Sequence, residues 1–196
     1  MTLDAAPTAR GRAKAERRAA LLSSAAHLFA ARGFDGVSIE DLGSSVGISG
    51  PAVYRHFAGK QAVLAALLVG VSEGLLVGGR AVVAAADDDP AALRALVRFH
   101  VDFALRDPDV IRVQDRDLAA LTAHDRESVR DLQRRYVDLW VDVLGRLSPS
   151  TERAERRLRA QATFGLLNST PHSARSVTLT RTRTLLAQMA LAALGH

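Results

Sequence analysis

A short segment in the first third of the chain brings hydroxyl, guanidinium, imidazole and ammonium groups close together. It reads Ser49-Gly-Pro-Ala-Val-Tyr-Arg-His56, and Lys60 follows shortly after it. Hydroxyl and guanidinium groups donate hydrogen bonds to base edges and phosphates, and an ammonium group at a helix start binds phosphate together with the free N–H groups there. These residue types at this spacing indicate nucleic-acid binding.

The segment needs an exposed helix to enter a major groove about 12 Å wide, and other helices must brace it. Gly33 and Gly47 are suited to end helices because glycine adopts positive φ readily, and Ser38 and Ser49 are suited to begin them as N-caps. Together with the apolar periodicity, these signals predict three helices, over residues 12–32, 38–46 and 49–56. Three helices with a glycine turn are what a helix-turn-helix requires.

The stretch from Val37 to Leu64 resembles the DNA-binding module of the TetR family of bacterial repressors. It contains a Gly-Ile-Ser turn, the sequence Tyr-Arg-His-Phe and a downstream lysine at the family's spacing, and residues 26–34 resemble the end of its first helix. The resemblance implies an all-α fold of nine helices. It divides the chain into a helix-turn-helix domain over residues 12–60 and a ligand-binding and dimerisation domain over residues 61–196.

The resemblance also implies which residues contact DNA. One set would anchor phosphates: Ser38, Tyr54, His56 and Lys60. A second set would face the base edges: Ser49, Gly50, Ala52 and Arg55. Arg55 stands where the family often has an aromatic residue, so two roles remain open for it, reading a guanine and gripping the backbone.

Positive charge is concentrated in the first part of the chain. Residues 1–60 hold 8 basic and 5 acidic residues, a balance of +3, whereas the longer remainder holds 18 and 16, a balance of +2. Nucleic-acid binding favours such a basic module. We expect a flexible basic arm at the N-terminal end, which either tracks the minor groove or only solubilises the chain: Arg10, Arg12, Lys14, Arg17 and Arg18.

The rest of the chain reads as longer helices, without the alternation typical of strands. They are expected over residues 60–85, about 89–104, 107–121, a stretch ending at 147, 150–168 and 178–193. Ser150 is expected to cap the eighth helix. The resemblance implies that the last two helices pair with those of a second copy, and a plausible seam on them consists of Leu158, Ala162, Leu166, Leu179, Leu186, Met189 and Ala193.

In the family the middle helices enclose an inducer pocket. We expect its lining to combine aromatic residues with a few polar ones: Phe99, His100, Phe103, Gln114, Tyr136, Trp140, Phe164 and Asn168. Ordinary core packing is the alternative interpretation of each, as it is of Val110, Val113, Leu118 and Leu167.

The stretch from Phe164 to Ser173 ends a helix with a glycine, an Asn-Ser-Thr turn and a proline. It is similar to a break in family members that regulate fatty-acid and acyl-CoA metabolism. The first expectation for the inducer is therefore a fatty acyl-CoA, whose phosphates would need arginines such as Arg175. A hydrophobic drug or antibiotic, as in regulators of efflux, and another small metabolite are the alternatives.

Composition excludes several other classes. The chain has no cysteine, hence no disulfide or thiolate metal site. Its six histidines lack metal-type spacing, and no serine-centred elbow or phosphate-binding glycine loop occurs, so we expect no enzyme, metal or cofactor. The longest apolar run, residues 62–71, is about half of the ~20 residues that a membrane span needs.

Together with these features, the resemblance implies a cytoplasmic homodimer that represses transcription from a palindromic DNA operator and is released by a hydrophobic ligand. Repression is the family's usual mode, and activation is the alternative. Two recognition helices would lie about 34–36 Å apart, one turn of DNA. A helical adaptor that does not bind DNA is the remaining alternative. That reading leaves the spacing from Tyr54 to Lys60 without a cause.

Overall fold

The computed structural model describes residues 9–170 and 177–195, and within them all regular structure is helical. The predicted all-α fold is confirmed. The elements in chain order are α1 (Ala9–Arg32), α2 (Ile39–Ser44), α3 (Gly50–Val53), α4 (Lys60–Ala84), α5 (Asp89–Arg106), α6 (Pro108–Asp117), the 3-10 helix η1 (Leu118–Ala120), α7 (Ala123–Leu147), α8 (Arg153–Leu167) and α10 (Leu179–Leu194).

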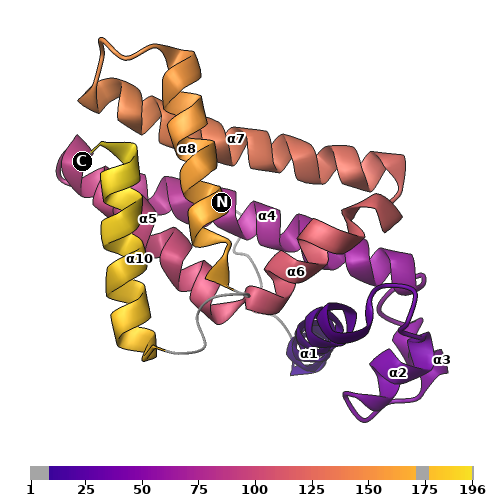
Figure 1. Ribbon diagram of the computed structural model, residues 1–196. Coiled ribbons are helices and arrows are strands. Elements are labelled where there is room, and N and C mark those ends of the chain that lie inside the picture. The colour runs from indigo at the N-terminus through magenta and orange to yellow at the C-terminus, as the bar shows by residue number, and fades with distance from the viewer. Residues whose placement is uncertain (1–8, 171–176, 196) are drawn as a thin grey trace, which may run out of the picture.

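The helices form a small head and a larger body (Figure 1). The head consists of α1, α2 and α3, which lie together at one end of the molecule. In the body, α4 and α7 run side by side, α5 packs against both, and α8 and α10 pack against each other at the other end. Helix α6 lies between the two parts and packs on α1.

Two hydrophobic cores hold this arrangement, and α4 belongs to both. Its first half contributes Leu64 and Leu68 to a core that also holds Phe29 of α1 and Val113 of α6. Its second half contributes Leu76 to a core formed with α5, α7, α8 and α10. Burying a Leu or Phe side chain contributes roughly 1.5–3 kcal/mol, so both ends of α4 are strongly anchored.

The second helix of the head begins as the sequence predicts, with Ser38 as its N-cap. The Ser38 hydroxyl accepts a hydrogen bond from the Asp41 N–H at 3.0 Å, and the Asp41 carboxylate accepts one from the Ser38 N–H at 2.9 Å. This reciprocal pair is a capping box, and the bond from the Ser38 backbone lowers the pKa of Asp41. Gly47 follows the helix with φ of 71°, which lets the chain turn into α3.

Several helix boundaries differ from the sequence-based expectation, and α2 already ends at Ser44 rather than at residue 46. Helix α3 ends at Val53 rather than at His56, because the next residues continue as tighter i to i+3 turns, such as the bond from His56 N–H to the Val53 carbonyl at 2.8 Å. Helix α8 begins at Arg153 with Glu152 as its N-cap, so the prediction that Ser150 caps it is wrong. A turn over residues 148–151 comes first.

The predicted flexible arm is also wrong over the described residues, because α1 begins at Ala9 and includes the basic residues. Residues 10–20 are exposed, and burial starts at Leu21. The alanines between the cations favour helix, which lets α1 continue beyond the part that packs on the head.

Helix α4 is long and apolar enough to cross a membrane by length and composition. The sequence reading missed this because its apolar run stopped at Val71, where glycine and polar residues interrupt it. In the structure α4 lies between α5 and α7 in the middle of the fold, and this position explains its apolar character.

The junction between head and body is fixed by Arg116 near the end of α6. Its guanidinium pairs with the Asp117 carboxylate at 3.0 Å and donates hydrogen bonds to the carbonyls of Phe29 and Ala30 at the end of α1. A cation at a helix C-terminus interacts favourably with the helix dipole and with the carbonyl groups there, and the Phe29 carbonyl also accepts a hydrogen bond from the Gly33 N–H at 2.8 Å.

A histidine lies in the centre of the body core. His100 of α5 is 3% exposed, and its Nε2 lies 3.1 Å from the Asn168 Oδ1 while its Nδ1 lies 3.4 Å from the Tyr136 hydroxyl. Rings of Phe103 and Phe164 pack on the imidazole with centroids 5.6 and 4.9 Å away. Burial lowers the pKa of His100 to about 4, so the ring is neutral at pH 7.

Two glycines of α4 test how closely the body helices approach. A β-carbon at Gly79 would lie 2.6 Å from Cε2 of Tyr136, whereas one at Gly74 would meet nothing within 4 Å. We expect Gly79→Ala to lower the unfolding free energy by about 1–2 kcal/mol through overpacking. We expect the control Gly74→Ala to raise it by about 0.5–1 kcal/mol through helix propensity. Urea unfolding of both variants measures this, and equal effects would contradict the packing argument.

The buried histidine predicts a defined pH dependence. Unfolded His100 takes up a proton near pH 6.5, but the folded group does so only near pH 4. The unfolded state therefore binds more protons between these values, and the unfolding free energy falls on acidification through that window, by about 3 kcal/mol in all. Urea unfolding of wild type and His100→Phe at several pH values should show a steeper fall for wild type. Parallel curves would mean that His100 is not held neutral.

Candidate nucleic-acid interface and ligand cavity

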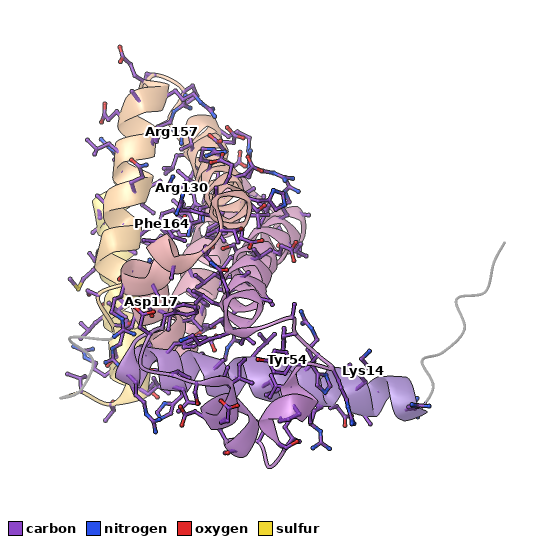
Figure 2. All side chains as sticks on the ribbon, turned by 90° about the vertical axis from the view of Figure 1, so that its right-hand side faces the viewer. Lys14, Tyr54, Asp117, Arg130, Arg157 and Phe164 are labelled. Atoms are coloured by element: carbon purple, nitrogen blue, oxygen red, sulfur yellow. The ribbon has the colours of Figure 1, made fainter. Side chains whose placement is uncertain are left out.

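The segment after α3 presents its side chains outward. Tyr54 is 58% exposed although it is a large aromatic residue, and Arg55 is exposed beside it. Val53 and Phe57 are buried and fix the segment to the head core. Figure 2 shows Tyr54 at the head end of the molecule, far from Phe164 in the body. Packing within the chain therefore gives no reason for an aromatic side chain at this position.

The other residues expected to contact bases differ in their exposure to solvent. Ser49 is exposed at the N-cap of α3 and makes no capping hydrogen bond with its side chain, which leaves its hydroxyl available. Ala52 is half-buried. Gly50 is buried, and a β-carbon there would lie 3.0 Å from Oε1 of Glu40 on α2. Gly50 therefore serves the close approach of α2 and α3 rather than the exposed face.

Two cations of the head lie over aromatic rings. The Lys60 ammonium, at the first residue of α4, lies 4.4 Å from the centroid of the Phe34 ring. The Arg18 guanidinium lies 4.8 Å from that of Phe57. Such contacts hold a cation in place without neutralising it. The Ser38 hydroxyl, by contrast, is engaged in the capping box, although its side chain remains exposed.

A cavity of about 190 Å³ lies in the body between α4, α5, α6, α7 and α8. Six of the eight predicted pocket residues line it: His100, Phe103, Gln114, Tyr136, Phe164 and Asn168. Trp140 does not reach it but supports its wall, with its ring 4.9 Å from that of Phe164. Phe99 packs elsewhere in the body core.

The sequence reading missed several lining residues of this cavity. Ser72, Leu75, Ile111, Gln133 and Val137 complete the lining. Each is an ordinary residue on an amphipathic helix, and no local signal separates such a residue from the core. The other pocket candidates belong to the cores: Val110 and Val113 are buried near α1, Leu118 packs against that core, and Leu167 is buried in the body. Arg175 lies outside the described residues.

The lining combines apolar walls with uncharged polar groups. Among the described residues that line it, there is no Asp, Glu, Lys or Arg. His100 and Asn168 bond to each other, and the Ser72 hydroxyl donates to the Leu68 carbonyl at 2.8 Å. The amides of Gln114 and Gln133 remain as groups that can bond to an occupant. The cavity therefore suits an uncharged group with little polarity.

Helices α8 and α10 expose apolar residues on the surface away from the body core. Leu158 is 66% exposed, Leu179 57% and Met189 52%. Ala162 and Ala193 are also exposed, Leu166 is half-buried, and Leu186 is buried inside this chain. Most of the predicted seam is thus on the surface, but Leu186 serves the chain's own core.

Comparison with known proteins extends these observations. The model of the tetR family of bacterial regulatory proteins matches residues 21–67, and the model of the tetracyclin repressor-like C-terminal domain matches residues 87–172. The HTH-type transcriptional repressor KstR2 of Rhodococcus jostii is 30% identical over 132 residues. These are 67% of this chain and 65% of that protein, so the match spans just under two thirds of the relative.

Solved structures share the fold. A TetR-family transcriptional regulator from Bordetella parapertussis matches with a TM-score of 0.81 at 23% identity, over 90% of this chain and 93% of the other. AibR, solved with isovaleryl coenzyme A and operator DNA, matches with a TM-score of 0.73 at 19% identity, over 90% and 97%.

The residues that the two family models match form the helix-turn-helix of the head and most of the helical body in the structure. The resemblance stated from the residues is thereby confirmed. This chain belongs to the TetR family of bacterial regulatory proteins.

Proposed function

We propose that the protein is a cytoplasmic, homodimeric repressor that binds a palindromic DNA operator and leaves it when a small hydrophobic ligand enters the body cavity. The observation that carries this proposal is the course of α4. Its first residue, Lys60, lies against the head over the Phe34 ring, and Ser72 and Leu75 of the same helix line the cavity. At 1.5 Å per residue, about 18 Å of helix separates Lys60 from Ser72.

In this proposal, residues 12–60 bind DNA and residues 61–196 bind the ligand and dimerise. Tyr54, His56 and Lys60 contact phosphates, while Ser49, Ala52 and Arg55 approach the major groove. The KstR2 relative is a repressor by name, which supports the sign of regulation. No catalytic role is assigned to any residue.

A dimer is part of the proposal because one recognition segment offers few base contacts. Two-fold symmetry doubles them and matches a palindrome. The exposed Leu158, Leu179 and Met189 on α8 and α10 provide an apolar surface for the second copy.

For the ligand we favour an acyl-CoA whose short acyl group enters the cavity. A volume of about 190 Å³ is below the ~300–1,000 Å³ of sites for drug-sized molecules, which argues against the efflux-type alternative. The described residues of the lining bear no charge, so the coenzyme phosphates would remain outside it. The solved AibR complex holds isovaleryl coenzyme A, a short acyl thioester, in a protein of the same fold.

The proposed signal passes from cavity to head by two helices. Helix α4 carries Ser72 and Leu75 at the cavity, and α6 carries Ile111 and Gln114 there. The end of α6 holds α1 through Arg116. A ligand that displaces either helix displaces the head, which changes the distance between the two recognition segments of a dimer. For a hundredfold loss of DNA affinity, the ligand must favour the non-binding state by about 2.7 kcal/mol.

DNA selection from a random library, followed by fluorescence anisotropy, tests the proposal. We expect a selected duplex with two half-sites about 34–36 Å apart, bound at least about a thousandfold more tightly than a scrambled one at 150 mM salt. Lys60→Ala should weaken binding to both duplexes and lower the salt slope by about one, because one phosphate contact is lost. Absence of DNA binding even at low salt would favour the adaptor.

The ligand class is tested by titrating acyl-CoAs of four to eight carbons into the protein–DNA complex, with free coenzyme A as control. We expect the acyl thioesters, but not coenzyme A, to release DNA. Val137→Phe fills part of the cavity and should raise the releasing concentration at least about tenfold without changing DNA affinity, because Val137 lines the cavity and lies outside the head. Val77→Phe, at an exposed position of α4, is the matched control. Equal responses of the two variants would place the ligand elsewhere.

A further inference from the structure

We propose that the side-chain amide of Asn168 recognises the carbonyl oxygen of the ligand, so that the cavity selects acyl compounds over alkyl compounds of the same length. The inference rests on the proposed binding of an acyl-CoA. It assigns a role to a row of hydrogen-bonded side chains, formed by Tyr136, His100 and Asn168, all of which line the cavity.

The hydrogen bond between His100 and Asn168 has only one possible direction. The Nε2 atom of His100 lies 3.1 Å from the Oδ1 atom of Asn168, and an amide oxygen accepts hydrogen bonds but does not donate them. Nε2 must therefore carry a proton. Because burial lowers the pKa of His100 to about 4, the ring is neutral at pH 7 and has no second N–H proton.

The other nitrogen of the ring is then an acceptor. Nδ1 of His100 lies 3.4 Å from the hydroxyl group of Tyr136, whose O–H donates to it. Burial raises the pKa of Tyr136, so the hydroxyl keeps its proton. The direction of both bonds is thus fixed: the tyrosine donates to the imidazole, and the imidazole donates to the amide. Each hydrogen bond in such a row polarises the next one.

This order leaves the amide nitrogen of Asn168 as the free end of the row. Its Oδ1 is engaged with His100, whereas Nδ2 donates to no other group in the described part of the chain. Because Asn168 lines the cavity, its N–H groups are available to an occupant. They match a carbonyl oxygen, which only accepts, but a methylene group in the same place would leave them unpaired.

Asn168 is held in place before a ligand binds. Its backbone N–H donates to the Phe164 carbonyl at 2.8 Å at the end of α8, and the imidazole holds its side-chain oxygen. The other amides of the lining belong to Gln114 and Gln133, which have one more rotatable bond each. Ordering a flexible side chain on binding costs free energy, so the oriented amide of Asn168 is the better donor.

The rest of the lining favours an uncharged carbonyl. Leu75, Phe103 and Ile111 provide apolar walls for the carbon chain of an acyl group. A carboxylate would accept the same hydrogen bond, but the described residues of the lining include no cation to balance its charge, and His100 is neutral. Burying an unpaired charge is costly. The carbonyl of a thioester is therefore the acceptor that this cavity suits.

Isothermal titration calorimetry on the full chain tests the selection with two compounds that differ at one carbon atom. Butanoyl-CoA carries the carbonyl group, and S-butyl-CoA is the thioether with a methylene group in its place. We expect wild type to bind butanoyl-CoA about three- to tenfold more tightly, because the thioether leaves the donor of Asn168 unpaired.

A matched pair of variants assigns this preference to the amide. Asn168→Asp keeps an oxygen that accepts from His100 but has no N–H group, so we expect the preference for butanoyl-CoA to disappear. Gln161→Glu makes the same change from amide to carboxylate at an exposed position of α8 outside the cavity. It should keep the preference within about twofold of wild type. Circular dichroism checks the fold of both variants.

Nitrogen-15 NMR of the wild-type protein tests the direction of the bonds without a ligand and does not depend on the folding of Asn168→Asp. We expect the His100 ring at pH 7 to carry its proton on Nε2 and none on Nδ1, and the signals are assigned by their loss in His100→Phe. A proton on Nδ1 instead would reverse the row, turn the Asn168 oxygen toward the cavity and overturn the inference.

The calorimetric outcomes separate this inference from the proposed function. Equal binding of both compounds by wild type overturns the selection by Asn168 but leaves acyl-CoA binding in place. Equal loss of the preference in both variants attributes it to charge rather than to the amide, which also overturns the inference. If wild type binds neither compound, the proposed ligand class and the inference fail together.

Discussion

The membership of α4 in two hydrophobic cores is the constraint on which the rest of this structure depends. Leu64 and Leu68 are fully buried with the head helices, and Leu76 is buried with the body helices. Burial of each such side chain contributes roughly 1.5–3 kcal/mol, so detaching the helix from either core costs several kcal/mol of free energy. Head and body therefore move relative to one another only if α4 bends or if packing within one core changes.

A second connection between head and body is polar, whereas the connection through α4 is apolar. Arg116 holds the last carbonyls of α1, and its own charge is balanced by Asp117, which is 8% exposed. Breaking one side of such a partly buried network leaves polar groups without partners, which costs more than an exposed ion pair contributes. The His27 and Asp109 side chains, 3.1 Å apart, form a further link between α1 and α6, but His27 is 76% exposed and adds little. Arg116 is the stronger link.

The sequence was most informative where local chemistry decides the structure. Capping by Ser38, the positive φ of Gly47 and the apolar stripe of α1 each follow from a few adjacent residues. It was least informative where distant segments meet. The pairing of Arg116 with the end of α1 joins residues 86 and 87 positions apart, and no periodicity predicts it. The cavity lining illustrates both cases. The sequence predicted aromatic and polar residues that stand out on apolar helices, such as His100, but it did not predict Gln133 and Val137, which resemble any other helix residue.

Magnitudes connect the small cavity to the proposed control of DNA binding. Burying a methylene group contributes about 0.8 kcal/mol, so an acyl group of four or five carbons contributes roughly 3–4 kcal/mol. That amount shifts an equilibrium between two conformations by more than a hundredfold if only one of them accommodates the group. A larger ligand is not required, because α4 and α6 both reach the cavity and both hold the head. In the proposed mechanism, the tight joining of head to body by these two helices makes a cavity of about 190 Å³ sufficient.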